Sequence, residues 1–115
     1  MNILVTGANG LLGRYLIDIL SNSGHIVFAL VKDKSKLNFD KNQNINIVEM
    51  DLSNIELSKL PQNIDAIYYL AQSNRFREFP DGINDMLDIN VVAPNILAKW
   101  AIEKGVKKFI YASSG

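Results

Sequence analysis

The sequence predicts an α/β fold in three layers, with helices on both faces of a doubly wound parallel sheet whose strand order is 3-2-1-4-5. Short apolar runs alternate along the chain with helical patterns and short links, which indicates parallel strands joined by right-handed crossovers. The first two runs are apolar nearly throughout, as expected where both faces of a sheet are buried. In such a sheet, ligands bind at the switch point between strands 1 and 4.

The composition limits the classes of function. The chain has 115 residues, enough for one domain at most. Its 12 basic residues balance its 12 acidic residues, so neither nucleic acid nor an anionic membrane is an expected partner. It has no cysteine and one histidine, which excludes disulfides, thiolate metal sites and a histidine-based metal cluster. No apolar run reaches the roughly 18 residues of a membrane span and no signal peptide precedes the first strand, so we expect a cytoplasmic protein.

The first strand, at 2–6, leads into the glycines Gly7, Gly10 and Gly13. Gly7 permits a turn that a Cβ would obstruct, Gly10 leaves room for a pyrophosphate, and Gly13 lets the next helix pack close to the strand. Amides at the start of that helix would receive the phosphate charge. An ordinary glycine-rich turn is the alternative. The helix is indicated by apolar residues at helical intervals, namely Leu11, Leu12, Tyr15, Leu16, Ile19 and Leu20.

The remaining elements follow from apolar runs and the residues that interrupt them. Four more strands are expected, at 25–31, 45–48, 64–71 and 107–112. Two more helices are expected, a short one over 53–60 and a long one from about 81 to 104. Pro94 lies inside the long helix, where it should kink the helix or begin its second segment.

The last residues place the end of the chain at the tip of a strand, on the edge where α/β proteins keep their chemistry. A domain boundary falls more often in an exposed linker. We therefore expect 1–115 to be an incomplete NAD(P)-binding domain, from the front part of a longer protein whose catalytic and substrate-binding part lies further along.

Five motifs, in order, resemble the extended short-chain dehydrogenase/reductase superfamily and, within it, the NAD-dependent epimerase/dehydratase family. They are the glycine loop at 6–13, Met-Asp-Leu at 50–52, Leu-Ala at 70–71, Asn-Val at 90–91 and the strand at 109–114 that ends in two serines. The resemblance covers the whole chain and implies a Rossmann-like fold that binds a dinucleotide.

The resemblance assigns roles to these motifs. Asp51 and Leu52 would close on the adenine, Leu70 and Ala71 would pass beside the ribose and phosphates, and Asn90 would steady the active-site backbone. Without the resemblance, Asp51 is interpreted as a strand-end or capping residue and Asn90 as an exposed helix residue. The cofactor-binding residues carried over are Gly7, Asn9, Gly10, Leu11, Leu12, Gly13, Asp51, Leu52, Leu70, Ala71, Asn90 and Ser113.

Ser114 is the expected catalytic residue, a hydrogen-bonding partner of the substrate hydroxyl or carbonyl, although a Ser-Ser-Gly strand exit is also an ordinary turn. The Tyr-x-x-x-Lys pair with which the family transfers protons is absent from this chain, and Tyr69, Gln72 and Pro94 depart from the family pattern. We therefore expect the chain alone to be inactive.

The parent protein would be an epimerase, dehydratase or oxidoreductase that transfers hydride to or from a sugar nucleotide or a small carbonyl substrate. A non-catalytic NAD(P)-sensing regulator of the same fold is the alternative. A third hypothesis is a structural or interaction protein built on a decayed Rossmann-like scaffold. The intact glycine loop argues against it. A homodimer is also expected, through the helix at 81–104, with Leu97 and Trp100 partly uncovered; the alternative is that both pack on the sheet.

The end of the second strand favours NADP over NAD. An enzyme that prefers NAD usually places Asp or Glu there, to bind the ribose hydroxyls. This chain has Val31 and then Lys32, and Lys36 and Arg14 would lean toward an added phosphate. The alternative is that Asp33 binds the ribose, if the strand ends later.

Overall fold

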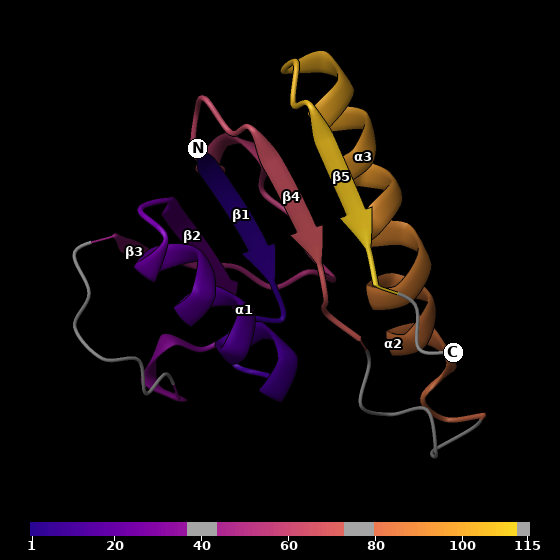
Figure 1. Cartoon of the computed structure of the whole chain (residues 1–115). Helices are drawn as coiled ribbons and strands as arrows, with labels where there is room; N and C mark the ends of the chain where they lie inside the picture. Colours follow the sequence, from indigo (N-terminus) through magenta and orange to yellow (C-terminus); the bar gives the residue numbers. More distant parts are fainter. Residues whose placement is uncertain (37–43, 73–79, 113–115) are drawn as a thin grey trace.

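The computed structural model describes residues 1–36, 44–72 and 80–112. It confirms a five-stranded parallel sheet in the order β3-β2-β1-β4-β5. The arrows of β1, β4 and β5 in Figure 1 point to one edge of the sheet. Because β2 and β3 are parallel to them, the carboxyl ends of all five strands meet there. The strands are β1 (Asn2–Thr6), β2 (Ile26–Val31), β3 (Ile45–Glu49), β4 (Ala66–Tyr69) and β5 (Lys108–Tyr111).

Helices cover both faces of the sheet, as predicted (Figure 1). Successive side chains of β1 alternate between the faces: Ile3 and Val5 pack with Ile17 of helix α1 (Leu11–Asn22). Leu4 packs on the other face with Leu97 of helix α3 (Ala93–Glu103). The chain therefore has two apolar cores, one on each side of the sheet.

Helix α1 forms where predicted, but its apolar periodicity does not mark the face that packs on the sheet. Its buried residues are Gly13, Ile17 and Ser21, four residues apart. The apolar side chains on the outer side of α1 are exposed, namely Leu11 at 91%, Tyr15 at 68%, Leu12 at 59% and Ile19 at 47%. The small residues Gly13 and Ser21 face inward because α1 lies close to the loop and to β1.

The long helix is interrupted, as Pro94 led us to expect. It consists of α2 (Ile83–Leu87), a π-helical turn η3 (Asp88–Val92) and α3, which begins at Ala93 with Pro94 in its first turn. The proline has no N–H to donate, and a position in the first turn of α3 requires none. The second segment of the helix therefore begins at the proline.

The expected exposure of Leu97 and Trp100 is wrong, and the alternative, that both pack on the sheet, is confirmed. Both side chains are buried against the sheet, with exposed fractions of 0% and 4%. The outer side of this helix instead presents Leu87, Val91 and Ile96. No helix within the described ranges is long and apolar enough to cross a membrane.

The short helix predicted at 53–60 is reduced to one 3-10 turn, η2 (Leu57–Lys59). The Asp51 carboxylate accepts hydrogen bonds from the Ser53 N–H at 2.9 Å and the Ser53 hydroxyl at 2.7 Å. The Asn54 N–H bonds to the Asp51 carbonyl. These local hydrogen bonds form a turn where the first turn of the helix was expected. A second 3-10 turn, η1 (Lys34–Lys36), follows β2.

Candidate functional site

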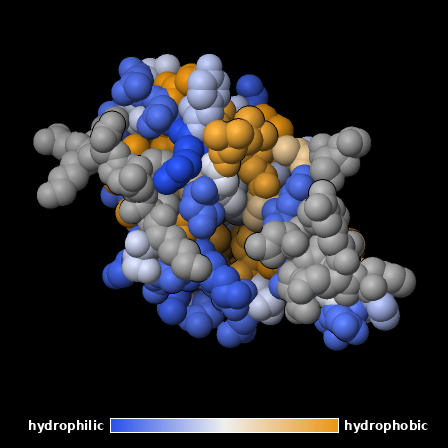
Figure 2. All heavy atoms as spheres, turned by 90° about the horizontal axis from the view of Figure 1, so that it is seen from below, coloured by the Kyte–Doolittle hydropathy of each residue, from blue (hydrophilic) through white to orange (hydrophobic). Residues whose placement is uncertain are grey.

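A pocket with a volume of about 560 Å³ lies at the carboxyl ends of β1, β2 and β4. Its size falls in the range of about 300–1,000 Å³ that is typical of small-molecule sites. Figure 2 looks onto this edge of the sheet, where apolar side chains lie near the middle and polar ones toward the outside. The pocket therefore occupies the predicted switch point between the first and fourth strands.

One side of the pocket is the glycine loop, and we call residues 7–13 the loop wall. Gly7 has a φ of +69°, and a Cβ there would lie 2.8 Å from the Ala71 nitrogen. A Cβ on Gly13 would lie 2.2 Å from the Gly7 carbonyl oxygen, so α1 begins in contact with the loop. Gly10 is less constrained, because its Cβ would meet only that same oxygen, at 3.3 Å. Glycine is thus sterically required at Gly7 and Gly13.

Helix α1 begins at this loop with free donors. Gly10 is its N-cap residue and no side chain caps the helix. The Gly10 N–H bonds to the Gly7 carbonyl, and the Arg14 N–H closes the first turn on the Gly10 carbonyl at 3.0 Å. The first amides of a helix, here those of Leu11, Leu12 and Gly13, have no acceptor within the helix and form its positive end.

The ends of β1 and β4 are joined through a buried hydroxyl. The Thr6 side chain is fully buried and accepts hydrogen bonds from the Leu70 N–H at 3.1 Å and the Ala71 N–H at 3.2 Å. Both amides lie just beyond the last register pair of the two strands, Thr6 with Tyr69. Thr6 therefore fixes the floor of the pocket where the two strands separate, a role that the sequence analysis did not give it.

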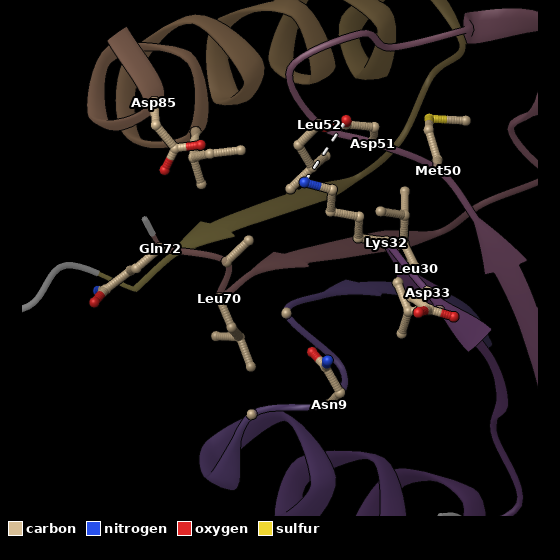
Figure 3. Close-up of a pocket in the computed structure, with 15 residues that line it drawn as sticks. Asn9, Leu30, Lys32, Asp33, Met50, Asp51, Leu52, Leu70, Gln72 and Asp85 are labelled. Carbon is tan, nitrogen blue, oxygen red and sulfur yellow. Dashed lines mark ion pairs between the residues drawn. The ribbon is translucent and has the colours of Figure 1, made fainter. Parts of the chain in front are cut away.

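The charged part of the pocket lies at the ends of β2 and β3. Lys32 extends toward Asp51, with 3.9 Å between the ammonium nitrogen and a carboxylate oxygen (Figure 3). Hydrogen bonds from the Ser53 hydroxyl and amide, and the nearby charge of Lys32, hold the pKa of Asp51 below its usual value against a smaller opposing effect of burial. Asp51 is therefore a carboxylate near neutral pH. Its hydrogen bonds to Ser53 form a turn after β3 and cap no helix, because the N-cap of η2 is Glu56.

Two acidic residues near Lys32, Asp33 after β2 and Glu49 at the end of β3, accept hydrogen bonds from the segment that follows β2. One oxygen of Asp33 accepts hydrogen bonds from the Ser35 N–H at 3.0 Å and its hydroxyl at 2.6 Å. Glu49 accepts one from the Lys34 N–H. Strand β2 ends at Val31, so Val31 and not Asp33 occupies the end of the strand.

The other side of the pocket belongs to the long helix, and we call Asp85 and Ile89 the helix wall. Figure 3 shows Asp85 and Asn9 on opposite sides of the pocket, with Leu70 between them. This wall was not predicted from the sequence, although the spacing of four residues on a helix places the two side chains on one face. Asp33, the alternative ribose ligand, also lines the pocket. Other lining residues that were not predicted as site residues are Leu30, Val31, Met50 and Gln72.

The pocket brings together eight of the predicted site residues. The lining ones are Gly7, Asn9, Gly10, Lys32, Asp51, Leu52, Leu70 and Ala71. Those that do not line it are Leu11, Leu12, Gly13, Arg14 and Asn90. Ser113 and Ser114 lie outside the described residues. Within the described ranges, no group of three or more His, Cys, Asp or Glu side chains is placed to hold a metal ion.

The arrangement combines amide donors at a helix start, an apolar slot, and a carboxylate beside an ammonium group. Its residues match the model of the NAD dependent epimerase/dehydratase family over residues 3–115. The chain belongs to this family.

Relatives of this chain are found both by sequence and by structure. The chain is 30% identical over 128 residues to UDP-glucose 4-epimerase from Mycolicibacterium smegmatis, covering 100% of this chain and 39% of that protein. A short-chain dehydrogenase/reductase superfamily protein from Agrobacterium tumefaciens with bound NAD is 27% identical, with a TM-score of 0.80 over 100% of this chain and 33% of that one.

UDP-glucuronic acid 4-epimerase from Bacillus cereus, a mutant in complex with a fluorinated substrate analogue and NAD, is 26% identical. It superimposes with a TM-score of 0.80, over 96% of this chain and 39% of that one. The chain thus spans between 33% and 39% of the length of these three relatives.

Proposed function

We propose that this chain binds the adenosine and pyrophosphate part of NAD(P) in the described pocket, as the cofactor-binding part of a sugar-nucleotide epimerase or dehydratase. The observation that supports this most directly is the uncapped start of α1, beside a loop that approaches the residues after β4 too closely for a Cβ. The pyrophosphate would accept hydrogen bonds from the Leu11, Leu12 and Gly13 amides. Leu11 and Leu12 would thus act through their backbone, which is why their side chains need not line the pocket.

The adenosine would lie between the loop wall and Asp51, with Leu52, Leu70 and Ala71 as its apolar surroundings. Ionised Asp51 would accept a hydrogen bond from the adenine amino group. When bound, the nicotinamide ring supplies or accepts hydride. In the whole protein Ser114 would hydrogen-bond the substrate and Ser113 would lie beside the nicotinamide.

We propose NADP as the preferred cofactor, on the evidence of Lys32. Val31 cannot bind the ribose hydroxyls, and Asp33 bonds to Ser35 in its own loop. The Lys32 side chain is 78% exposed and pairs with Asp51 only at 3.9 Å, so turning it toward a phosphate costs little. A charge-assisted bond to the phosphate should strengthen binding about tenfold.

Calorimetric titration of the chain with NADP and NAD tests both proposals. We expect both dinucleotides to bind, NADP more tightly, and Lys32→Ala to remove the difference. Lys104→Ala is the control, since Lys104 is exposed at the far end of α3. Absence of binding by either dinucleotide would refute the site, whereas equal binding unaffected by Lys32→Ala would refute the cofactor preference alone.

We expect no turnover from the 115-residue chain, because it lacks the Tyr-x-x-x-Lys pair. Steady oxidation or reduction of a sugar nucleotide by the pure chain would refute this. The regulator of the same fold remains the alternative function. It predicts cofactor binding without turnover even in the whole protein, so an assay of that protein with a sugar nucleotide separates the two.

Homodimerisation through the long helix is proposed with other contacts than the sequence suggested. Leu87, Val91 and Ile96 are exposed on its outer side, whereas Leu97 and Trp100 are buried. Sedimentation should show a dimer that Val91→Lys disrupts. The matched control is Ile102→Lys, at an exposed position near the end of α3. A monomer at high concentration would refute the dimer.

A further inference from the structure

The π-helical turn η3 changes which backbone donors reach two successive carbonyls. In η3 the Ala93 N–H bonds to the Asp88 carbonyl, five residues back. In an uninterrupted α-helix that N–H would bond to Ile89, and residue 94 would donate to Asn90. Pro94 has no N–H. The carbonyls of Ile89 and Asn90 are therefore accessible to donors from outside the helix.

Two tyrosines of the sheet supply such donors. The Tyr69 hydroxyl donates to the Ile89 carbonyl, and the Tyr111 hydroxyl donates to the Asn90 carbonyl at 3.0 Å. Tyr69 ends β4 and Tyr111 ends β5, and the two are register partners. Their rings stack, with centroids 5.7 Å apart and planes 17° apart. Two rigid side chains therefore hold two successive carbonyls of the helix.

This contact bears directly on the pocket. Ile89, whose carbonyl accepts from Tyr69, is a member of the helix wall, and Asp85 lies one turn earlier on the same helix. Tyr69 is fully buried and directly precedes Leu70 and Ala71, which line the pocket from β4. The same ring thus sits between the floor of the pocket and its helix wall.

The protonation state of the Tyr69 donor is fixed as well. Burial, and secondarily the neighbouring Tyr111, raises the pKa of Tyr69 above its usual value. Its hydroxyl therefore remains protonated and able to donate throughout the physiological pH range. A tyrosine side chain has few rotatable bonds, so the position of its hydroxyl is fixed by the position of its strand. Its hydrogen bond therefore fixes the helix relative to that strand.

We propose that Tyr69 and Tyr111 are positioning residues, which set the distance of the helix wall from the ends of β4 and β5 and thereby the shape of the dinucleotide pocket. The inference rests on the proposed function for its effect on binding, but not for its effect on the helix. Tyr69 has the larger role, since its partner Ile89 itself lines the pocket. Tyr111 acts one residue further, through Asn90.

The test uses variants that keep the ring and remove the hydroxyl. Tyr69→Phe and Tyr111→Phe are compared with Tyr68→Phe, because Tyr68 is the adjacent residue of β4 and packs on the opposite face of the sheet. Hydrogen exchange of the amides at 88–97 is measured without ligand, and NADP and NAD affinities by calorimetry. Both are measured at a temperature where every variant is fully folded, so that global destabilisation does not contribute.

We expect faster exchange at 88–97 in Tyr69→Phe and Tyr111→Phe but not in Tyr68→Phe. Dinucleotide binding should weaken about three- to tenfold in Tyr69→Phe and less in Tyr111→Phe, as for loss of one hydrogen bond. Unchanged exchange and affinity relative to Tyr68→Phe would overturn the inference. If the unsubstituted chain binds no dinucleotide, the proposed function fails, and the exchange data alone then decide whether the tyrosines hold the helix.

Discussion

On the loop wall of the pocket, backbone lies directly against backbone, whereas on the helix wall side-chain hydroxyls reach backbone carbonyls. The loop wall depends on residues without a Cβ, because no Cβ fits at Gly7 or Gly13. The helix wall depends on added atoms, the hydroxyls of Tyr69 and Tyr111. The loop wall should therefore not tolerate a larger residue at these glycines. The helix wall can be weakened one hydrogen bond at a time. Substitutions on the two sides should therefore differ in size as well as in kind.

The largest effect is expected at Gly13. Gly13→Ala places a Cβ 2.2 Å from the Gly7 carbonyl oxygen, so α1 or the loop must move, and we expect a loss of about 3 kcal/mol in unfolding free energy. Gly10→Ala is the matched control, because its Cβ meets that oxygen at 3.3 Å, and its cost should stay under about 1 kcal/mol. Urea unfolding of both variants measures the difference. Equal losses would contradict the steric account of the loop wall.

Thr6→Val should have the second largest effect, because it combines both kinds of contact. The change keeps the shape of the side chain but removes the oxygen that accepts from the Leu70 and Ala71 amides. Burying those donors without an acceptor should cost about 2 kcal/mol. Thr6→Ser retains the oxygen and should lose less. Urea unfolding that ranks Thr6→Ser below Thr6→Val in stability would show that the methyl group, and not the hydroxyl, holds the strand ends.

The two walls also differ in how well the sequence predicts them. The fold and the loop wall could be predicted because their signature lies in a short stretch of sequence: a strand, glycines three residues apart and a helix. The stacked pair of Tyr69 and Tyr111 joins residues 42 positions apart, and its partners are main-chain atoms with no sequence signature.

The sequence could not decide which faces of the helices pack on the sheet. Periodicity showed that α1 is a helix but not which side it buries, because the close approach at Gly13 selects the small residues. On the long helix, the sequence left open whether Leu97 and Trp100 are partly uncovered or pack on the sheet, and the structure buries them. Deciding between the faces requires knowing where the sheet lies, which is a tertiary fact.

On the helix side, we expect Pro94→Ala to have a smaller effect, of about 1 kcal/mol in unfolding free energy. Alanine supplies the N–H that proline lacks, so it offers the Asn90 carbonyl a donor from within the helix. The hydroxyl of Tyr111 then becomes less important. We expect Tyr111→Phe to destabilise the Pro94→Ala chain less than the unsubstituted one, a non-additivity measured by a double-mutant cycle in urea. Strict additivity would show that the proline does not create the need for the tyrosine.

The smallest effect on stability is expected at Asp51, whose pKa is lowered by the hydrogen bonds of the turn that it forms with Ser53. Ser53→Ala removes the hydroxyl that contributes most to lowering the pKa of Asp51, so that pKa should rise toward 3.8. A carboxyl group with a lowered folded-state pKa stabilises the protein above its unfolded pKa, and this contribution is lost as pH falls through the folded value. The substitution should thus reduce stability slightly at pH 6 and not at a pH below both values. NMR titration of the Asp51 carboxyl carbon measures the shift directly, and Ser58→Ala, in η2, is the control. A midpoint for Asp51 that is the same in both variants would show that the Ser53 hydroxyl does not set its charge.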